Sequence, residues 1–281
     1  MDFIEKYYNK FNEDKRLQSR HGIVEFTISL EYITKYLNLQ KNSEQLKILD
    51  VGAGTGRYSY ALHNLGHNVT AVEYVKKNLS VLKQNYPYIK AYQGSALNLS
   101  RFKNESFDAV ILFGPMYHLF SFEDKLQALE EAKRVTKKDG VIFVAYLLNN
   151  YAIIRHGFMD KHIVESINLG KVDQNFNIHS NIEDLYSYIN LEDIEKLNTS
   201  ANLNRKEMIS PDGPTDYIRP YINNLSEEEF NLYIDFVRKK ARNMLSGFCV
   251  LLKAIIRIAT IIIQQQELQL LLQQQLLQQR L

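Results

Sequence analysis

The sequence predicts an α/β protein built on a doubly wound, mostly parallel sheet with helices on both faces. Between residues 46 and 148, short apolar runs of strand length alternate with amphipathic stretches of helix length. The first apolar run, 46–51, leads into three glycines at alternate positions, which let the backbone turn sharply beside a ligand that any Cβ would block. Because strand-helix alternation requires right-handed crossovers, these observations favour a parallel sheet.

The expected elements follow one another in a regular order. Residues 1–40 are predicted to be helical, because apolar side chains recur at three- and four-residue steps at Ile23, Phe26, Leu30, Ile33 and Leu37. Strands are then expected at 46–51, 69–73, 89–93, 107–113 and 141–148. Helices are expected between them at 57–65, 76–85 and 122–137, and a turn at 138–140 leads into the fifth strand.

Beyond residue 148 the alternation is interrupted. Apolar positions within 149–190 indicate helices with an exposed loop at 175–181, and long connections of this kind are usually functional. The sequence then predicts a helix, a short strand, a loop with two prolines and a capped helix, at 191–203, 205–209, 210–214 and 226–243.

The C-terminal region allows two interpretations. Residues 248–252 are a candidate strand, whereas Lys253, Arg257, Thr260 and Gln264 mark one polar stripe of an amphipathic helix. A membrane span is not expected here, because two cations in its middle would cost roughly 5 kcal/mol. Residues 264–281 are almost entirely Gln and Leu, and we assign no chemical role to this low-complexity sequence.

The spacing of the glycines discriminates between nucleotide-like ligands. A dinucleotide fingerprint, G-x-G-x-x-G/A, would need Gly or Ala at position 57 or 59, where the chain has Arg57 and Ser59. The spacing therefore weakens an NAD-binding interpretation. Glu73 ends the second apolar run about 20 residues beyond the glycines, where a doubly wound sheet places a carboxylate that accepts both ribose hydroxyls.

The pattern Asp50-x-Gly52-x-Gly54-x-Gly56 resembles the cofactor-binding signature of the class I S-adenosylmethionine-dependent methyltransferases. The stretch 131–144 is also similar to the helix, lysine-rich turn and fifth strand of that family. The resemblance is continuous up to residue 148. It implies a Rossmann-like, seven-stranded sheet with helical cap insertions, and S-adenosylmethionine as the cofactor.

The resemblance also implies which residues contact that cofactor. They lie at the carboxyl ends of the first four strands and are Asp50, Gly52, Ala53, Gly54, Gly56, Glu73, Tyr74, Ser95, Ala96, Phe113 and Gly114. Ser95 departs from the acidic residue or amide that relatives commonly carry near the adenine. Because a hydroxyl accepts hydrogen bonds more weakly than a carboxylate, we expect backbone groups and apolar packing to hold much of the adenine.

Tyr117 and His118, after the fourth strand, are the candidate catalytic residues. Methyl transfer requires mainly that nucleophile, methyl carbon and sulfur be aligned and water excluded. Tyr117 and His118 are placed to orient the acceptor. His118 is either a general base or a residue that makes a structural hydrogen bond or packs against the cofactor. No metal site is expected. The tetrad of base and protein-glutamine methylases is replaced by Gly114-Pro115-Met116-Tyr117, which favours a small-molecule acceptor that is methylated on O or N.

Composition narrows the partners. The formal net charge of +2 gives little attraction for a polyanion, so nucleic acid is not an expected partner. The single cysteine, Cys249, cannot form an intramolecular disulfide, and residues 1–5 lack the features of a secretory signal, so a cytoplasmic location is expected, as a monomer or homodimer. Two other functions stay open: an NAD-dependent oxidoreductase, and a non-catalytic cofactor-binding or interaction protein that uses residues 264–281.

Five segments are therefore expected: a helical leader or lid, the cofactor-binding core, a cap insertion, a C-terminal part with a second cover, and a Leu/Gln tail, at 1–40, 41–148, 149–190, 191–258 and 259–281. The leader is expected either to pack on the sheet or to cover the cofactor with polar and aromatic side chains from Tyr7, Tyr8, Asn12, Arg16 and His21.

Overall fold

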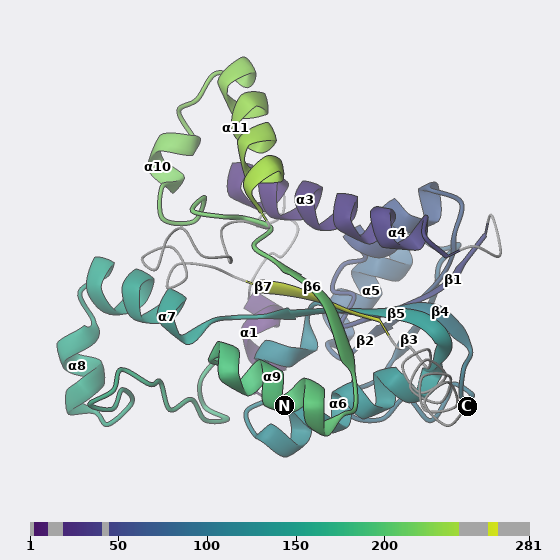
Figure 1. Cartoon of the computed structure of the whole chain (residues 1–281), viewed down its shortest axis with the longest axis horizontal. Coiled ribbons are helices and arrows are strands. Elements are labelled where there is room, and N and C mark those ends of the chain that lie inside the picture. Colours follow the sequence, from purple (N-terminus) through teal and green to yellow (C-terminus); the bar gives the residue numbers. More distant parts are fainter. Residues whose placement is uncertain (1–2, 11–18, 41–44, 242–257, 264–281) are drawn as a thin grey trace, which may run out of the picture.

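A parallel sheet forms the centre of the protein. The computed structural model describes residues 3–10, 19–40, 45–241 and 258–263. Five strands pair in parallel in the order β3-β2-β1-β4-β5 (Figure 1). They are β1 Lys47–Val51, β2 Asn68–Glu73, β3 Lys90–Gln93, β4 Phe107–Leu112 and β5 Thr136–Tyr146. This confirms the predicted Rossmann-like, doubly wound architecture.

Helices cover both faces of the sheet (Figure 1). On one face lie α3 Arg20–Leu37, α4 Arg57–Asn64 and α5 Lys76–Asn85; on the other lie α6 Phe122–Val135 and α9 Leu191–Ser200. Successive side chains of a strand point to opposite faces, so a strand that is apolar throughout serves both layers. In β1, Ile48 accordingly packs in the cluster with α3 and α4, whereas Leu49 packs in the cluster with α6 and α9.

The turn expected at 138–140 is instead an irregularity inside β5. Phe107 pairs with Thr136 and Ala109 pairs with Val141, so β5 advances by five residues while β4 advances by two. A side chain at Gly140 would place its Cβ 2.4 Å from Thr136 Cγ2 and 2.8 Å from the Asp108 carbonyl oxygen. The bulge therefore fits closely against β4 and depends on glycine.

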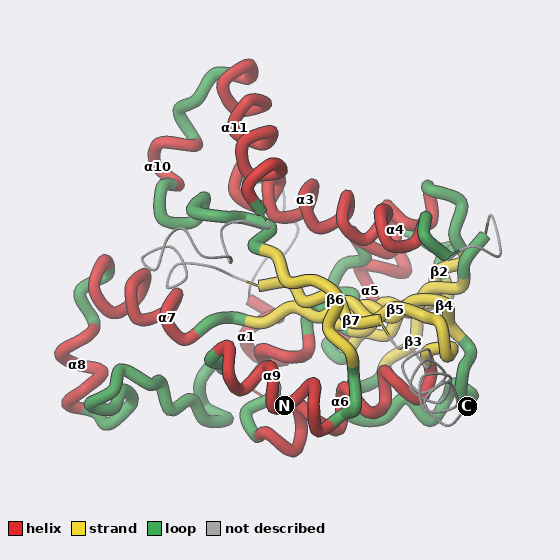
Figure 2. Tube along the Cα trace, viewed as in Figure 1, coloured by secondary structure: helices red, strands yellow, loops and turns green. Residues whose placement is uncertain are grey.

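A long excursion follows β5. It contains the short helix α7 Asn149–Ala152, the π-helix η2 Ile153–Met159 and the helix α8 Ile163–Asn168. Residues 169–190 then run to α9 without a regular helix or strand, and Figure 2 shows this segment as loop. Helices followed by a loop confirm the arrangement that the sequence predicts for 149–190.

The C-terminal part returns to the sheet. β6 Asn204–Ile209 is followed by the short helix α10 Arg219–Ile222 and by α11 Glu227–Lys240. At the start of α11, the side chain of Ser226 accepts a hydrogen bond from the Glu229 amide, and the side chain of Glu229 accepts one from the Ser226 amide. This capping box is the start that the sequence predicts for the helix.

The strand that closes the sheet is not the expected one. β7 Ile258–Ile263 pairs antiparallel with both β5 and β6. The candidate strand 248–252 lies outside the described residues, and the amphipathic-helix interpretation is wrong for 258–263. The expected segment boundary at 258 also falls within β7, so residues 259–263 belong to the sheet. Among the described residues, no helix combines the length and apolarity needed to cross a bilayer.

Candidate active site

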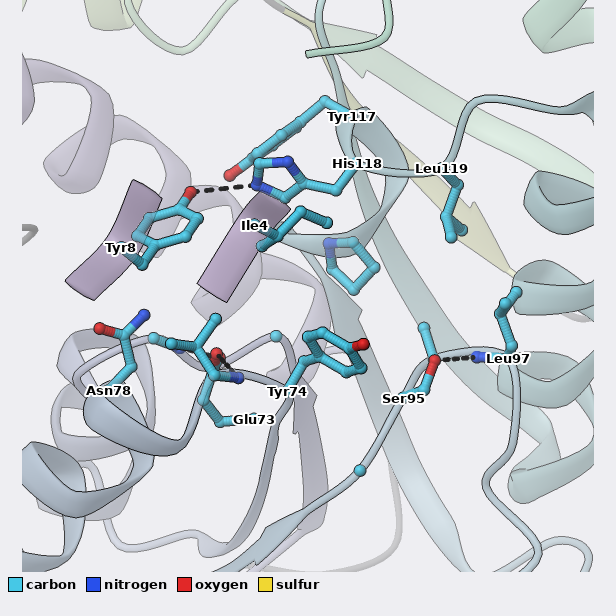
Figure 3. A pocket seen from close by; sticks show the side chains of 17 residues that line it. Ile4, Tyr8, Glu73, Tyr74, Asn78, Ser95, Leu97, Tyr117, His118 and Leu119 are labelled. Carbon is cyan, nitrogen blue, oxygen red and sulfur yellow. Dashed lines mark hydrogen bonds between the residues drawn. The ribbon is translucent and has the colours of Figure 1, made fainter. Parts of the chain in front are cut away.

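A cavity of about 260 Å³ opens at the carboxyl ends of the parallel strands. This is where ligands bind in open α/β sheets, because the loops after neighbouring strands diverge there. The described residues that line the cavity include nine of the predicted site residues: Gly52, Gly54, Glu73, Tyr74, Ser95, Ala96, Gly114, Tyr117 and His118. Figure 3 shows several of these side chains converging from different loops.

The three glycines after β1 have different structural roles. All three adopt positive φ angles, of 75° at Gly52, 58° at Gly54 and 93° at Gly56. A Cβ on Gly52 would lie 2.6 Å from Pro115 Cδ, so this glycine lets the loops after β1 and β4 pack together. A Cβ on Gly56 would lie 2.8 Å from Leu82 Cγ. By contrast, a Cβ on Gly54 would meet no atom within 4 Å, so this position faces the open cavity.

Glu73 links the glycine loop to the end of β2 through hydrogen bonds. Its side chain is buried, one carboxylate oxygen accepts a hydrogen bond from the Gly54 amide at 2.8 Å, and the other accepts one from the Val75 amide at 2.8 Å. Burial raises the pKa of Glu73, while these two amides oppose that rise. The Asn78 side chain also donates to this carboxylate, and the lone pair that remains can accept a ribose hydroxyl without giving up the loop.

Asp50 lies under the loop and does not line the cavity. It is 3% exposed, and the Ser59 hydroxyl on α4 donates to it at 2.6 Å. Burial raises the pKa of Asp50 to about 6, although the hydrogen bonds from Ser59 act in the opposite direction. The carboxyl group therefore ties the end of β1 to the first helix.

We expect Asp50 to make stability depend on pH. Its pKa rises from 3.8 in the unfolded chain to about 6 in the folded protein, so the folded state binds more protons between these values. Stability then falls as pH rises from about 4 to about 6, by an amount on the order of 3 kcal/mol. Asp50→Asn removes this contribution, and urea unfolding at several pH values measures the difference from the wild type. An exposed control, Asp139→Asn, should keep the wild-type profile; equal profiles for wild type and Asp50→Asn would contradict the prediction.

The structure does not bring four of the predicted contacts to the cavity wall. Asp50 and Gly56 are structural supports as described, and Ala53 packs against the cluster that contains Leu82. The ring of Phe113 packs against that of Tyr58, with centroids 5.2 Å apart. These residues support the loops but do not line the cavity.

Ser95 supports its own turn. Its hydroxyl oxygen accepts a hydrogen bond from the Leu97 amide at 3.2 Å, drawn in Figure 3. The hydroxyl proton is still available to a ligand. Tyr74, which is 42% exposed, lies between Glu73 and Ser95 in the same view, so its ring forms part of the wall on that side.

His118 is held from both sides. Its Nδ1 lies 2.9 Å from the Leu185 carbonyl oxygen, and because a carbonyl only accepts, Nδ1 carries the proton. In the neutral ring Nε2 is then an acceptor, and it receives the Tyr8 hydroxyl at 3.0 Å (Figure 3). The Leu185 carbonyl thus fixes the neutral tautomer in which Nε2, the basic nitrogen, faces the cavity.

Tyr8 comes from helix α1 Phe3–Lys10, which contributes Ile4 as well to the cavity wall. That the leader acts as a lid stays a prediction. Of the other leader residues, Tyr7 packs edge-on against Tyr8 with centroids 5.3 Å apart, and His21 is absent from the lining. Asn12 and Arg16 lie outside the described residues.

Residues 185–187 form a clamp on the loop after β4. The Ser187 amide donates to the Tyr117 carbonyl oxygen at 2.8 Å, and the Tyr186 ring packs against both Tyr117 and His118. Buried Lys125 donates to the Ser187 hydroxyl at 2.7 Å and also to the Leu119 carbonyl. Burial lowers the pKa of Lys125 to about 8.

Sequence reasoning missed several lining residues: Ile4, Val75, Asn78, Gly94, Leu97, Pro115 and Leu119. Val75, Gly94 and Pro115 directly follow strands, so their positions carried a usable signal. No local pattern indicates Ile4 or the 185–187 clamp. In the described part of the chain, no three His, Cys, Asp or Glu side chains are grouped so as to hold a metal ion.

Comparison with known proteins places this site in a family. Residues 49–144 match the model of a methyltransferase domain. A demethylmenaquinone methyltransferase of Streptomyces avermitilis is 37% identical over 99 residues, which are 35% of this chain and 41% of the relative. The alignment therefore spans less than half of that relative's length.

Solved structures share the fold over more of the chain. A SAM-dependent methyltransferase from Methanosarcina mazei has a TM-score of 0.54 at 13% identity, covering 82% of this chain and 97% of its own. A Burkholderia thailandensis 1,6-didemethyltoxoflavin-N1-methyltransferase, solved with S-adenosylhomocysteine, has a TM-score of 0.52 at 12% identity, covering 94% and 88%. The glycine loop and Glu73 lie within the matched residues, as does most of the parallel sheet. Residues 49–144 therefore form a methyltransferase domain, within a chain that has the fold of S-adenosylmethionine-dependent methyltransferases.

Proposed function

We propose that this protein transfers a methyl group from S-adenosylmethionine to an oxygen or nitrogen atom of a small molecule. The observation that carries the proposal is the Glu73 carboxylate, which lies in the cavity wall and holds the open Gly54 position. A carboxylate there suits two ribose hydroxyls, and a bare Gly54 leaves room for the amino-acid end of the cofactor. The walls at Tyr74 and Ser95–Leu97 lie where the adenine would be bound.

The bound cofactor supplies an activated methyl group on a sulfonium. The protein has to orient the acceptor, exclude water and take up a proton. With that cofactor bound, the acceptor's lone pair would form the new bond to the methyl carbon, the electron pair of the carbon–sulfur bond would go to sulfur, and the acceptor's proton would leave to a base. We assign this base to His118 Nε2, which faces the cavity and takes the proton when the Tyr8 hydroxyl turns away from it. Tyr117 orients the acceptor from the same loop.

Other features support a small acceptor. The relative described above is named for demethylmenaquinone, and the Burkholderia structure contains 1,6-didemethyltoxoflavin; both are small molecules. Helix α1 contributes Ile4 and Tyr8 to the cavity wall, and Leu185 and Ser187 contact the loop that carries Tyr117 and His118. The pairing of β7 with β5 and β6 supports the seven-stranded form of the family's sheet as part of the proposal.

Ligand binding distinguishes this function from an NAD-dependent oxidoreductase. We expect S-adenosylmethionine and S-adenosylhomocysteine to raise the melting temperature, and NADH to leave it unchanged, in a thermal-shift assay. A shift with NADH alone would overturn the proposal. A panel of small phenols, acids and amines with radiolabelled S-adenosylmethionine then tests catalysis, since a purely cofactor-binding protein would label none of them.

Replacement of His118 tests the proposed base. We expect His118→Asn to lower kcat about a hundredfold with the best acceptor of the panel and to flatten the rise of kcat with pH, because general-base catalysis is worth about 10²- to 10⁴-fold. Tyr8→Phe removes the hydroxyl but keeps the imidazole, so it should retain the pH dependence. Unchanged turnover of His118→Asn across pH would remove His118 from the mechanism.

A further inference from the structure

A second cavity, of about 230 Å³, lies in the excursion between β5 and α9. The described residues that line it all fall between 152 and 188, from the end of α7 through η2 and α8 to the loop before α9. None of them lines the first cavity. Figure 1 shows this excursion projecting from the end of the sheet, beyond the strands of the core. It is therefore a separate space, formed by one continuous segment of the chain.

The interior of the second cavity is apolar. Its walls include aliphatic side chains and two aromatic rings, from Ile153, Ile163, Val172, Ile178, Tyr186 and Tyr188. Such walls suit a hydrocarbon or aromatic body, and a cavity of this size accommodates one small ring system.

Three histidines give this cavity a polar rim. His156, His162 and His179 line it, and their side chains are 52%, 63% and 61% exposed. Each has a carboxylate close to one ring nitrogen: Asp160 lies 3.1 Å from His156 Nδ1, Glu165 lies 3.6 Å from His162 Nδ1, and Asp173 lies 3.3 Å from His179 Nε2.

The carboxylates are on the outer side of these pairs. Asp160, Glu165 and Asp173 do not line the cavity, whereas the imidazoles do. A carboxylate that accepts the N–H of one ring nitrogen stabilises the cationic imidazole and directs the other ring nitrogen elsewhere. In each pair, the second ring nitrogen lies on the opposite side of the imidazole from the carboxylate.

The remaining charges of the rim balance one another. Lys171 and Asp184 both line the cavity and form an ion pair at 2.6 Å. Arg155, which neighbours His156, pairs with Asp160 and Asp216. Among the residues that the structure describes, no three His, Cys, Asp or Glu side chains are grouped so as to hold a metal ion.

We propose that the second cavity binds a small organic anion, with its apolar body between Ile163 and Tyr186 and its charged group at His156, His162 and His179. This inference does not rest on the proposed function, because the two cavities share none of their described lining residues.

The site is coupled to the first cavity through one segment. Leu185 and Tyr186 line the second cavity, and the same two residues hold His118, through the Leu185 carbonyl and the Tyr186 ring. A ligand that orders this segment would therefore also order the imidazole of His118, because both cavities depend on the same short stretch of chain.

Calorimetric titration of the full chain tests the proposal. The probes are benzylsulfonate, phenylacetate and neutral benzyl alcohol, with S-adenosylhomocysteine present throughout to fill the first cavity. We expect both anions to bind at least about tenfold more tightly than the alcohol, because hydrogen bonds between charged partners are the stronger ones. Equal affinities for the anions and the alcohol would overturn the proposal. A preference for only one anion identifies whether sulfonate-like or carboxylate groups fit.

Two kinds of variant locate the site. The triple variant His156→Gln, His162→Gln, His179→Gln changes only exposed side chains, so it should fold, and we expect it to bind benzylsulfonate about tenfold more weakly. His63→Gln, on α4 and away from the cavity, is the matched control and should bind normally. Ile163→Trp fills the interior and should abolish binding of every probe. Unchanged binding by either the triple variant or Ile163→Trp would contradict the assignment.

Discussion

Glu73→Gln is expected to weaken the binding of S-adenosylmethionine about a hundredfold. The carboxylate is a pure acceptor that serves the Gly54 and Val75 amides, one at each oxygen. A glutamine side chain has one oxygen and one NH₂ group, so its NH₂ would face a backbone N–H, and the loop and a ribose hydroxyl would both lose an acceptor. Two lost hydrogen bonds to a charged group cost about 3 kcal/mol or more, which is about a hundredfold in affinity.

Isothermal titration of the cofactor checks this result. Glu123→Gln, in the first turn of α6 and absent from the cavity lining, is the matched control and should bind the cofactor normally. Circular dichroism of Glu73→Gln without ligand shows whether the fold is intact. A folded Glu73→Gln variant with an affinity within threefold of the wild type would rule out the ribose-binding role.

Gly52→Ala is expected to destabilise the protein by about 2–4 kcal/mol. The new Cβ would lie 2.6 Å from Pro115 Cδ and 3.2 Å from the Gly114 Cα, and the backbone at Gly52 has a φ of 75°. Overpacking costs about 1–3 kcal/mol, and a left-handed conformation costs an alanine about 1–2 kcal/mol. Urea unfolding without ligand measures the change, and the cofactor cavity should lose its shape at the same time, because Pro115 lines it.

Gly54→Ala separates backbone strain from packing. This glycine also has a positive φ, of 58°, but its Cβ would meet no atom within 4 Å. We therefore expect only about 1 kcal/mol of destabilisation, from the left-handed backbone alone. The Cβ would enter the cavity, so cofactor binding should still be lost. Equal destabilisation by Gly52→Ala and Gly54→Ala would show that contact with Pro115 does not determine the cost.

The sequence predicts those site residues whose positions are determined by residues close to them in the chain. Gly52, Gly54 and Glu73 each stand at the end of an apolar strand, so the residue type and its distance from the strand carry the information. The apolar runs likewise identify the five parallel strands. Phe113 shows the limit of this reasoning: it also follows a strand, but its ring packs on Tyr58, and the direction of a side chain after a strand cannot be read from spacing.

The rest of the site depends on contacts between distant parts of the chain. The hydrogen bond between Tyr8 and His118 joins residues 110 positions apart, and that between His118 and Leu185 joins residues 67 apart. No periodicity records such pairings, although an aromatic leader indicated that a lid would include Tyr8.

The last strand illustrates a different limit. Residues 258–263 read Ile-Ala-Thr-Ile-Ile-Ile, and β-branched residues of this kind favour strands. A helical stripe through Thr260 competed with that preference, and an amphipathic pattern is a local signal. Pairing with both β5 and β6 determines the outcome, because a strand between two others satisfies its backbone on both sides.

The clamp formed by residues 185–187 affects how the substrate specificity of this protein can change. On the cap side, the bonds to Tyr117 and His118 are made by the main-chain amide of Ser187 and the main-chain carbonyl of Leu185. Main-chain atoms persist whatever side chain is attached. Amino-acid exchanges at 185–187 can therefore change the side chains of this segment while the His118 imidazole keeps its tautomer and orientation. Under the proposed function, selectivity could be redesigned there without rebuilding the proposed base.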